Sequence, residues 1–356
     1  GRFPYDHQGA VSFLTLLVLM KPFVLGLSLL AINLFTYGEV RLVEKLGPKT
    51  GINSPFGVAF DNKGNAYIAE YEGGRILKLD KKGKLQTFSG NGKKGYAGDG
   101  LLADKGMYSS MHNLAWASNN LLYISDTHNN LVRKINGNNN RLSTLAGTPY
   151  QKGFSGDNGL AKNAKLDTPI SISLTPDEKT LLIADIRNRR IRAVDLNSGI
   201  IRTIAGNGKK GKPIDGKLTL EQPLMDPRAA VMDDEGNLFV LERNGHALRV
   251  IHPDGKIYTL AGTGKRGQRD GPALQASFNG PKHLCVDRQE RIIIADDNNH
   301  LIRLYDPKTK SVSTILGGKA KPQTTLNRPH GVSIGPDGSL WVCDSWNNRV
   351  LTLSNY

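Results

Sequence analysis

The hydrophobic and polar positions of this chain follow one pattern that is written six times. Each copy holds three short runs of alternating apolar and polar residues, which we label strands A, B and C, separated by turn residues such as Asn62-Lys63-Gly64. Alternation with a period of two is typical of strands that bury one face. The copies begin, 48 to 58 residues apart, at Pro55, Met111, Pro169, Pro227, Pro281 and Pro329. This spacing indicates the blades of a β-propeller, because one small sheet cannot bury both of its faces whereas six in a ring can.

A fourth apolar run, strand D, follows five of the six copies. These runs begin at Leu85, Leu142, Ile201, Ile257 and Val312. The sixth copy lacks one, but residues 40–47 (VRLVEKLG) show the same alternation ahead of the first copy. We therefore predict an all-β fold, a six-bladed β-propeller of four-stranded antiparallel blades in which an N-terminal strand closes the last blade and removes two exposed sheet edges.

The repeat also carries a recurrent motif, an acid followed three positions later by Asn. The clearest instances are Asp126-x-x-Asn129, Asp185-x-x-Asn188 and Asp344-x-x-Asn347. Together with the phrase GNGKKGYAGDG from Gly90, this motif resembles the NHL-repeat family in its bacterial exported form, over about residues 40–356. Met111 in place of the leading proline and Asn244-Gly245 in the fourth copy depart from the pattern. The resemblance implies a six-bladed propeller that acts as a binding or scaffold module.

The N-terminal residues differ in kind from the repeats. Met20 and Lys21 precede residues 23–35, which carry no charge, and small and polar residues follow. This order is typical of a secretory signal peptide, and a membrane anchor is the alternative. We predict a signal or anchor region over residues 1–38, with Met20 as the natural start of translation, and a propeller over residues 39–356. The expected location is extracytoplasmic, either periplasmic or secreted, or held at a membrane by this segment.

The formal net charge of +15 is unevenly placed. Three basic pairs fall in equivalent D–A loops, which join strand D of one blade to strand A of the next: Lys93-Lys94, Lys209-Lys210 and Lys265-Arg266. In an up-and-down blade these loops share one face with the B–C turns. A basic face of this kind favours an anionic partner, namely a glycan, a lipid headgroup or an acidic protein. Nucleic acid is disfavoured by the predicted export signal, and we expect a monomer.

Acidic residues recur too regularly to predict an active site. The acids that end strand B (Glu70, Asp126, Asp185, Glu242, Asp296 and Asp344) are expected to hold the B–C turn by accepting bonds from backbone N–H groups two residues on. Arg133, Arg192, Arg249 and Arg303 are expected to pair with acids of a neighbouring blade. In the long D–A loops, Asp99, Asp157, Asp215 and Asp270 are expected to cap short helices.

The histidines break the repeat. His112 and His330 occupy the second position of strand A, and His283 the third position in blade 5. Six-bladed lyases of the peptidyl-amidoglycolate type resemble this chain and bind zinc with histidines at the channel mouth. A third ligand is difficult here, since a period of two points His283 away from the other two.

We therefore predict a binding or scaffold module, without a cofactor, rather than an enzyme. The alternative is a metal-dependent lyase or lactonase with zinc or calcium at the axial channel, and a third reading is an RNA-binding propeller. Besides the three basic pairs and the three histidines, the candidate ligand-binding residues are Asn129, Asn298 and Trp346.

Overall fold

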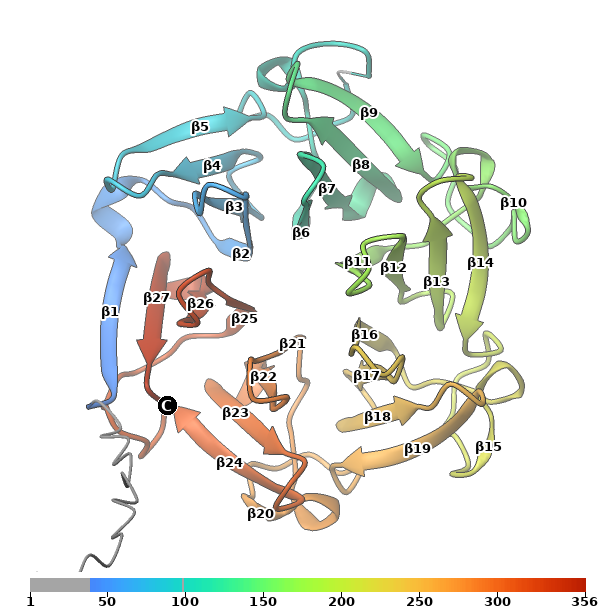
Figure 1. Ribbon diagram of the computed structural model, residues 1–356, viewed down its shortest axis with the longest axis vertical. Coiled ribbons are helices and arrows are strands. Elements are labelled where there is room, and N and C mark those ends of the chain that lie inside the picture. Colours follow the sequence, from blue (N-terminus) through green and yellow to red (C-terminus); the bar gives the residue numbers. More distant parts are fainter. Residues whose placement is uncertain (1–38, 98) are drawn as a thin grey trace, which may run out of the picture. The chain divides into compact units, whose positions relative to one another are not determined.

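The structure, a computed structural model, describes residues 39–97 and 99–356 and forms a ring of six antiparallel sheets around a central axis (Figure 1). The strands of each blade follow one another from the axis outward. Blade 1 contains β2 (Pro55–Phe60), β3 (Ala66–Glu70), β4 (Ile76–Leu79) and β5 (Leu85–Ser89). Blade 2 contains β6 (Met111–Ala117), β7 (Leu121–Asp126), β8 (Leu131–Asn136) and β9 (Arg141–Ala146).

Blades 3 to 5 repeat this order and add a fifth, two-residue strand on the outer edge. Blade 3 contains β11 (Pro169–Leu174), β12 (Thr180–Asp185), β13 (Arg190–Asp195), β14 (Ile200–Ala205) and the added β10 (Gly159–Leu160). Blade 4 contains β16 (Pro227–Met232), β17 (Leu238–Glu242), β18 (Ala247–Ile251), β19 (Lys256–Ala261) and β15 (Lys217–Leu218). Blade 5 contains β21 (His283–Val286), β22 (Ile292–Asp296), β23 (Leu301–Asp306), β24 (Ser311–Leu316) and β20 (Gly271–Pro272). The sequence analysis predicted four strands throughout; the extra pairs arise because each long D–A loop folds back onto the free edge of strand D, which is thereby covered.

Blade 6 closes the ring as predicted. It contains β25 (Pro329–Ile334), β26 (Leu340–Asp344) and β27 (Arg349–Ser354), and its outer strand is β1 (Arg41–Leu46). β1 runs antiparallel to β27, from Arg41 opposite Ser354 to Leu46 opposite Val350. The two ends of the propeller are thus joined by a β-ladder, with one register shift between Glu44 and Leu46.

Short 3₁₀ helices supply the remaining regular structure. They are η1 (Pro48–Thr50), η2 (Ala103–Lys105), η3 (Thr127–Asn129), η4 (Ala161–Asn163), η5 (Thr219–Glu221), η6 (Ala273–Gln275), η7 (Asp297–Asn299) and η8 (Ser345–Asn347). The predicted signal or anchor region lies outside the described residues. Within the described part, no helix is long and apolar enough to cross a membrane.

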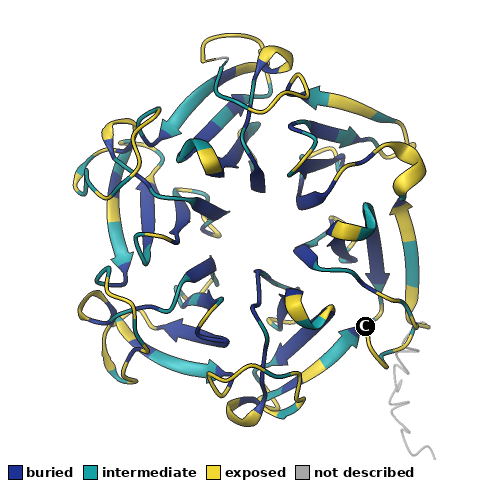
Figure 2. Cartoon of the chain, turned by 180° about the vertical axis from the view of Figure 1, so that it is seen from behind, coloured by how far each residue is buried: buried dark blue, intermediate teal, exposed yellow. Residues whose placement is uncertain are grey.

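The hydrophobic core lies between the blades. Six clusters of buried residues each join two neighbouring sheets, and the one between blades 6 and 1 includes Leu46, Val58, Ile68 and Val350. Figure 2 shows the same gradient, with buried inner strands and partly exposed outer ones. Burial at every interface makes the closed ring the stable state, because removing any interface would expose two apolar sheet faces.

The acids that end strand B tie each blade to the loop that enters it. All six accept a backbone N–H bond of 2.6 to 2.8 Å from the residue two before the start of strand A: Asn53, Ser109, Asp167, Met225, Asn279 and Asn327. Their structural role is as predicted. Asp126, Asp185, Asp296 and Asp344 do hold the B–C turn, but through the side-chain amide of the Asn three residues on. The predicted donor, a backbone N–H group two residues on, was wrong. The entry loop brings free donors of its own to the buried carboxylates, and a buried carboxylate needs several donors.

Four fully buried arginines pair with these acids inside their own blade. Arg133, Arg192, Arg249 and Arg303 lie 3.3, 3.4, 2.8 and 2.9 Å from the strand-B acids Asp126, Asp185, Glu242 and Asp296. The expectation of partners in a neighbouring blade was therefore wrong, because strand C runs directly beside strand B. Such buried pairs fix one geometry, and losing one partner would leave an uncompensated charge.

The loop aspartates do not cap helices. Asp157, for example, accepts bonds from Arg192 Nε (3.0 Å) and Thr203 Oγ1 (2.6 Å) of blade 3. Asp270 accepts from Arg303 and Thr314 of blade 5 in the same way. The 3₁₀ helices that follow them have no side-chain cap in the described residues. The capping prediction was wrong because strand D supplies a threonine donor to each aspartate, and at Asp99, Asp157 and Asp270 a buried arginine adds a charged donor.

Candidate ligand-binding site at the mouth of the ring

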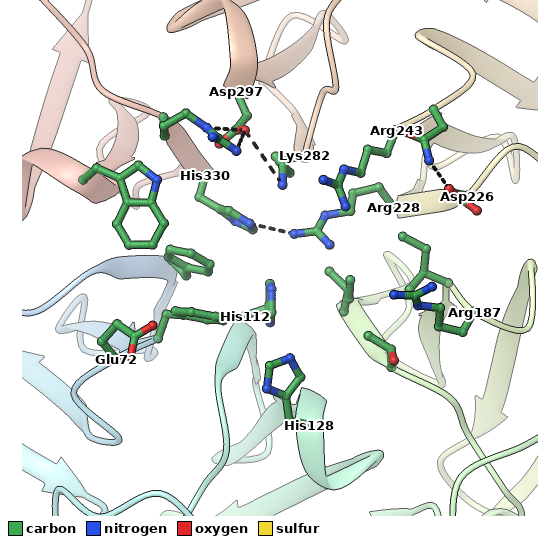
Figure 3. A pocket seen from close by; sticks show the side chains of 18 residues that line it. Glu72, His112, His128, Arg187, Asp226, Arg228, Arg243, Lys282, Asp297 and His330 are labelled. Atoms are coloured by element: carbon green, nitrogen blue, oxygen red, sulfur yellow. Dashed lines mark hydrogen bonds and ion pairs between the residues drawn. The ribbon is translucent and has the colours of Figure 1, made fainter.

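Two positions of every repeat meet at one mouth of the ring and line a cavity of about 550 Å³ (Figure 3). The first is the second residue of each copy of the repeat, occupied in blades 1 to 6 by Phe56, His112, Ile170, Arg228, Lys282 and His330. In blade 5 this residue directly precedes β21. The second is the B–C turn, which contributes Tyr71, Glu72, His128, Ile186, Arg187, Arg243, Asn244, Asp297 and Trp346. Because backbone geometry repeats around the ring, the chemistry of the cavity depends on which residue type each blade places at this first position.

An aromatic stack forms the side of the cavity toward blades 6 and 1. Phe56 lies between Tyr71 and His330, with ring centroids 4.3 and 3.9 Å away and nearly parallel planes. Trp346 meets the edge of Phe56 at 5.8 Å and is 42% exposed. Both faces of Phe56 are therefore used for packing, and Trp346 is the most exposed aromatic group of this stack.

The stack fixes His330 against a buried arginine. Arg228 Nη2 donates to His330 Nε2 at 2.7 Å. A guanidinium group can only donate, so the proton of His330 is on Nδ1 and the ring is neutral. Burial, reinforced by the charge of Arg228, holds the pKa of His330 well below its ordinary value. His330 is thus a neutral acceptor that orients the guanidinium.

Arg228 itself has no anionic partner. Its residue is 3% exposed, it pairs with no carboxylate in the part of the chain described, and its Nε is buried without a hydrogen-bond partner. Burial lowers the pKa of Arg228 to about 9, so the group remains a cation at neutral pH. A buried cation without a counter-ion is costly, and buried charges are ordinarily paired.

Further cations surround it on the side of blades 3 to 5. Lys282, Arg187, Arg243 and Arg328 all line the cavity, and Figure 3 shows Arg228, Arg243 and Lys282 close together. Asp297 is the acid that contacts two of them; it bonds Arg328 at 2.6 Å and lies 3.8 Å from Lys282. Asp226 is bonded by Asn244, and Glu72 pairs with Lys94 at 2.5 Å. The cavity therefore carries more positive than negative charge at its centre.

His112 presents a free ring nitrogen. Its Nδ1 lies 2.9 Å from the carbonyl oxygen of Ser110, which can only accept, so Nδ1 carries the proton and Nε2 is an acceptor. Burial, then the charge of Arg228, keeps the pKa of His112 well below its ordinary value. The predicted placement of His112 and His330 together is confirmed by their ring separation of 5.3 Å.

His283 lies elsewhere, in line with the strand period. Its Nδ1 lies 3.1 Å from Val332 O, its Nε2 is 2.9 Å from Asn113 Nδ2, and it lines a second cavity further along the axis. The three histidines therefore do not converge. Among the described residues, no group of three or more His, Cys, Asp or Glu could hold a metal ion, so the residues present do not fit the zinc or calcium site of the alternative prediction.

The other predicted ligand residues have different surroundings. Asn129 Nδ2 donates to Asp126 and to the carbonyl oxygen of Gly95, and these bonds stabilise the B–C turn. Asn298 lies beside Gly280 and does not line the cavity. Trp346 does line it. The six basic residues of the D–A loops are exposed and lie outside the cavity, namely Lys93, Lys94, Lys209, Lys210, Lys265 and Arg266. Of these, Lys94 bonds Glu72 at the rim of the cavity.

Arg228, Lys282 and Arg243 were missed by the sequence analysis. A signal for the first two was present, because aligning the six copies places them at the same position as His112 and His330. The basic pairs drew the prediction instead, since they are adjacent in the chain.

Comparison with known proteins identifies the repeat. A family model described as "NHL repeat" matches residues 326–353. Protein SUPPRESSOR OF QUENCHING 1, chloroplastic, of Arabidopsis thaliana is 30% identical over 292 residues, covering 78% of this chain and 27% of that protein. NHL repeat-containing protein 2 of Bos taurus is 25% identical over 354 residues, covering 88% and 48%. The chain thus spans between a quarter and a half of the length of these relatives.

A solved structure of streptogramin B lyase has a TM-score of 0.58 at 16% identity and covers 88% of this chain and 97% of its own. This likeness shows the fold alone. The NHL repeat and the ring of six blades support a binding or scaffold module. With the repeat match in blade 6, the chain is an NHL-repeat six-bladed β-propeller.

Proposed function

We propose that this propeller is a binding module that captures an anionic group of its ligand in the mouth cavity, next to Arg228. The observation that carries the proposal is the buried guanidinium without a carboxylate partner. A ligand carboxylate or phosphate would supply the missing counter-charge and accept from the unpartnered Nε. Charge-assisted bonds of this kind are among the strongest polar contacts in proteins.

The cavity also sets the size of the group that enters. A volume of about 550 Å³ is within the range of small-molecule sites. It would accept a small organic acid, or the acidic end of a larger partner whose remainder rests on the basic D–A loops. The positive charge of that face supports the second case, since the Lys94–Glu72 pair joins the loop surface to the rim.

The test is anion binding by the purified chain, with lactate and inorganic phosphate as probes at constant ionic strength. Isothermal titration or ligand-induced thermal stabilisation should show binding of at least one probe. Arg228→Met should weaken that binding by about tenfold or more, because a hydrogen bond to a charged group contributes roughly 1.5–3 kcal/mol.

Arg202→Met is the matched control, because Arg202 is an exposed arginine of the outer strand β14. It should bind as the unaltered chain does. A cooperative thermal transition in Arg228→Met shows that the variant is folded. Failure of both probes to bind, or equal binding by Arg228→Met, would overturn the proposal.

The metal-dependent lyase or lactonase alternative stays a prediction; His112 and His330 lie together, and His283 lines a second cavity. Elemental analysis of the purified chain tests it, and stoichiometric zinc or calcium would favour it.

A further inference from the structure

Lys282 has an unusual environment for a lysine. It is the second residue of the fifth repeat copy and directly precedes β21. Its side chain is 8% exposed, and Figure 3 shows its amine directed into the mouth cavity beside Arg228. The nearest carboxylate oxygen, Asp297 Oδ2, is 3.8 Å away, beyond hydrogen-bonding distance. That same oxygen accepts two bonds from Arg328, at 2.7 and 2.6 Å. The carboxylate is therefore committed to another cation.

The groups around Lys282 favour its neutral form. Burial is the main cause and the charge of Arg228 the next, with Arg243 and Arg328 adding to it and Asp297 opposing it; together they lower the pKa of Lys282 to about 6. His112 and His330, which line the same cavity, are neutral and add no charge. At neutral pH most Lys282 amines thus hold a free electron pair. Desolvation beside other cations is how lysines are activated as nucleophiles.

An electrophile suited to this amine must carry its own anion. Arg228 and Lys282 occupy equivalent positions of neighbouring blades and line one cavity. A 2-oxo acid has its carboxylate attached directly to its carbonyl carbon, so binding of the carboxylate by one cation presents the carbonyl to a group beside that cation. Holding the two reactants together in this way converts a slow bimolecular step into a local one.

We propose that Lys282 forms a reversible Schiff base with a small 2-oxo acid whose carboxylate is bound by Arg228. The proposal rests on the anion-binding function above and adds a covalent step to it. The electron pair of Nζ attacks the carbonyl carbon and a C–N bond forms. The carbonyl oxygen takes up the proton that nitrogen loses, giving a carbinolamine. A second proton transfer releases that oxygen as water and leaves the C=N bond, with no net oxidation or reduction.

Reductive trapping tests the step on the whole chain. Pyruvate and sodium cyanoborohydride are added, and the product is analysed by intact mass and by peptide mapping. We expect one reduced pyruvate adduct per chain, at Lys282, formed at least tenfold faster than at any other lysine. Adduct formation should increase as pH rises from 5 to 8, because the amine loses its proton near pH 6.

Lys282→Met should lose the adduct, whereas Lys308→Met, at an exposed lysine of a C–D turn, should keep it. Lactate binding separates the two proposals, since lactate has the carboxylate but lacks the ketone carbonyl that the amine would attack. Lactate binding without an adduct at Lys282 would overturn the Schiff base and leave the anion site standing. Adducts spread over surface lysines, or retained by Lys282→Met, would overturn it as well.

Discussion

At the scale of the residue, one backbone position of the repeat carries packing in some blades and chemistry in others. In blades 1 and 3 the second residue of the repeat copy is apolar, as Phe56 and Ile170, whereas in blades 4 and 5 it is Arg228 and Lys282. The backbone places each side chain at the same mouth, so a substitution there changes the cavity without changing the fold. This separation lets a propeller vary its ligand on a constant scaffold.

Lys282 should lower the stability of the folded chain, because its pKa is about 6 in the fold against 10.5 for an ordinary lysine. The unfolded state then binds more protons between these two values, so the stability rises with pH from about 6 to about 10.5. Lys282→Met removes this effect and should raise the free energy of unfolding at pH 7 by about 1–3 kcal/mol.

Denaturant unfolding of both proteins at pH 7 and pH 10 measures the difference. The gain should be smaller at pH 10, where the lysine of the unfolded chain has begun to lose its proton. Lys308→Met, at an exposed site, should change the stability by less than about 0.5 kcal/mol at either pH. A Lys282→Met protein less stable than the unaltered chain at pH 7 would show that Lys282 is held by a favourable ion pair with Asp297.

Comparing the copies where they disagree in residue type pointed to three residues of the mouth. His112, His330 and Trp346 were singled out on that ground, and all three line the cavity. It failed for Arg228 and Lys282 because arginine and lysine are ordinary surface residues, and nothing in a single sequence states that these two are buried. Burial at the mouth follows from closure of the ring, which brings six distant positions together.

At the scale of the element, the strands were predictable because alternation is a local property. The fifth strands were not: β10, β15 and β20 have two residues each, which is too short for any period. The roles of the loop aspartates were mistaken for the same reason. Asp157 accepts hydrogen bonds from Arg192 and Thr203, which lie 35 and 46 residues further along the chain. No local sequence pattern reveals contacts over such separations.

The closing strand β1 should be essential to the ring. Deleting residues 39–47 would remove the ladder with β27 and the buried side chain of Leu46. The outer edge of β27 and one apolar face would then be exposed. We expect the free energy of unfolding to fall by about 3 kcal/mol or more, with burial of one leucine accounting for roughly 1.5–3 kcal/mol of it.

Differential scanning calorimetry measures the change, and size-exclusion chromatography would detect association through the new edges. Val40→Ala is the matched control, since Val40 is 38% exposed and lies just before the strand. An unchanged melting temperature on deletion of residues 39–47 would contradict closure by β1.

At the scale of the whole molecule, the charge divides into two parts with different physics. The D–A loop pairs are exposed, whereas Arg228 and Lys282 lie within the cavity. Salt screens exposed charges beyond the Debye length, which is about 10 Å at an ionic strength of 0.1 M. Buried cations are screened far less. The outer charges should therefore attract an anionic ligand, and the inner ones should hold it.

This division predicts separate effects on the rate and the strength of binding. A variant with Lys93, Lys94, Lys209, Lys210, Lys265 and Arg266 all replaced by Gln should bind the probe anion of the mouth more slowly at low salt. Electrostatic steering of this kind changes association rates by tenfold or more. Its affinity at 0.5 M salt should stay within about threefold of the unaltered chain, because screening has already removed the contribution of the exposed loops.

Stopped-flow kinetics over a range of salt concentrations, with Arg228→Met measured in parallel, separates the two contributions. Arg228→Met should keep the salt dependence of association and lose the complex through faster dissociation. If the variant with six Gln substitutions instead lost affinity at 0.5 M salt while Arg228→Met retained it, the ligand would be held by the D–A loops. The mouth cavity would then be a passive feature of the ring, and the binding surface would be the one that the basic pairs in the sequence first indicated.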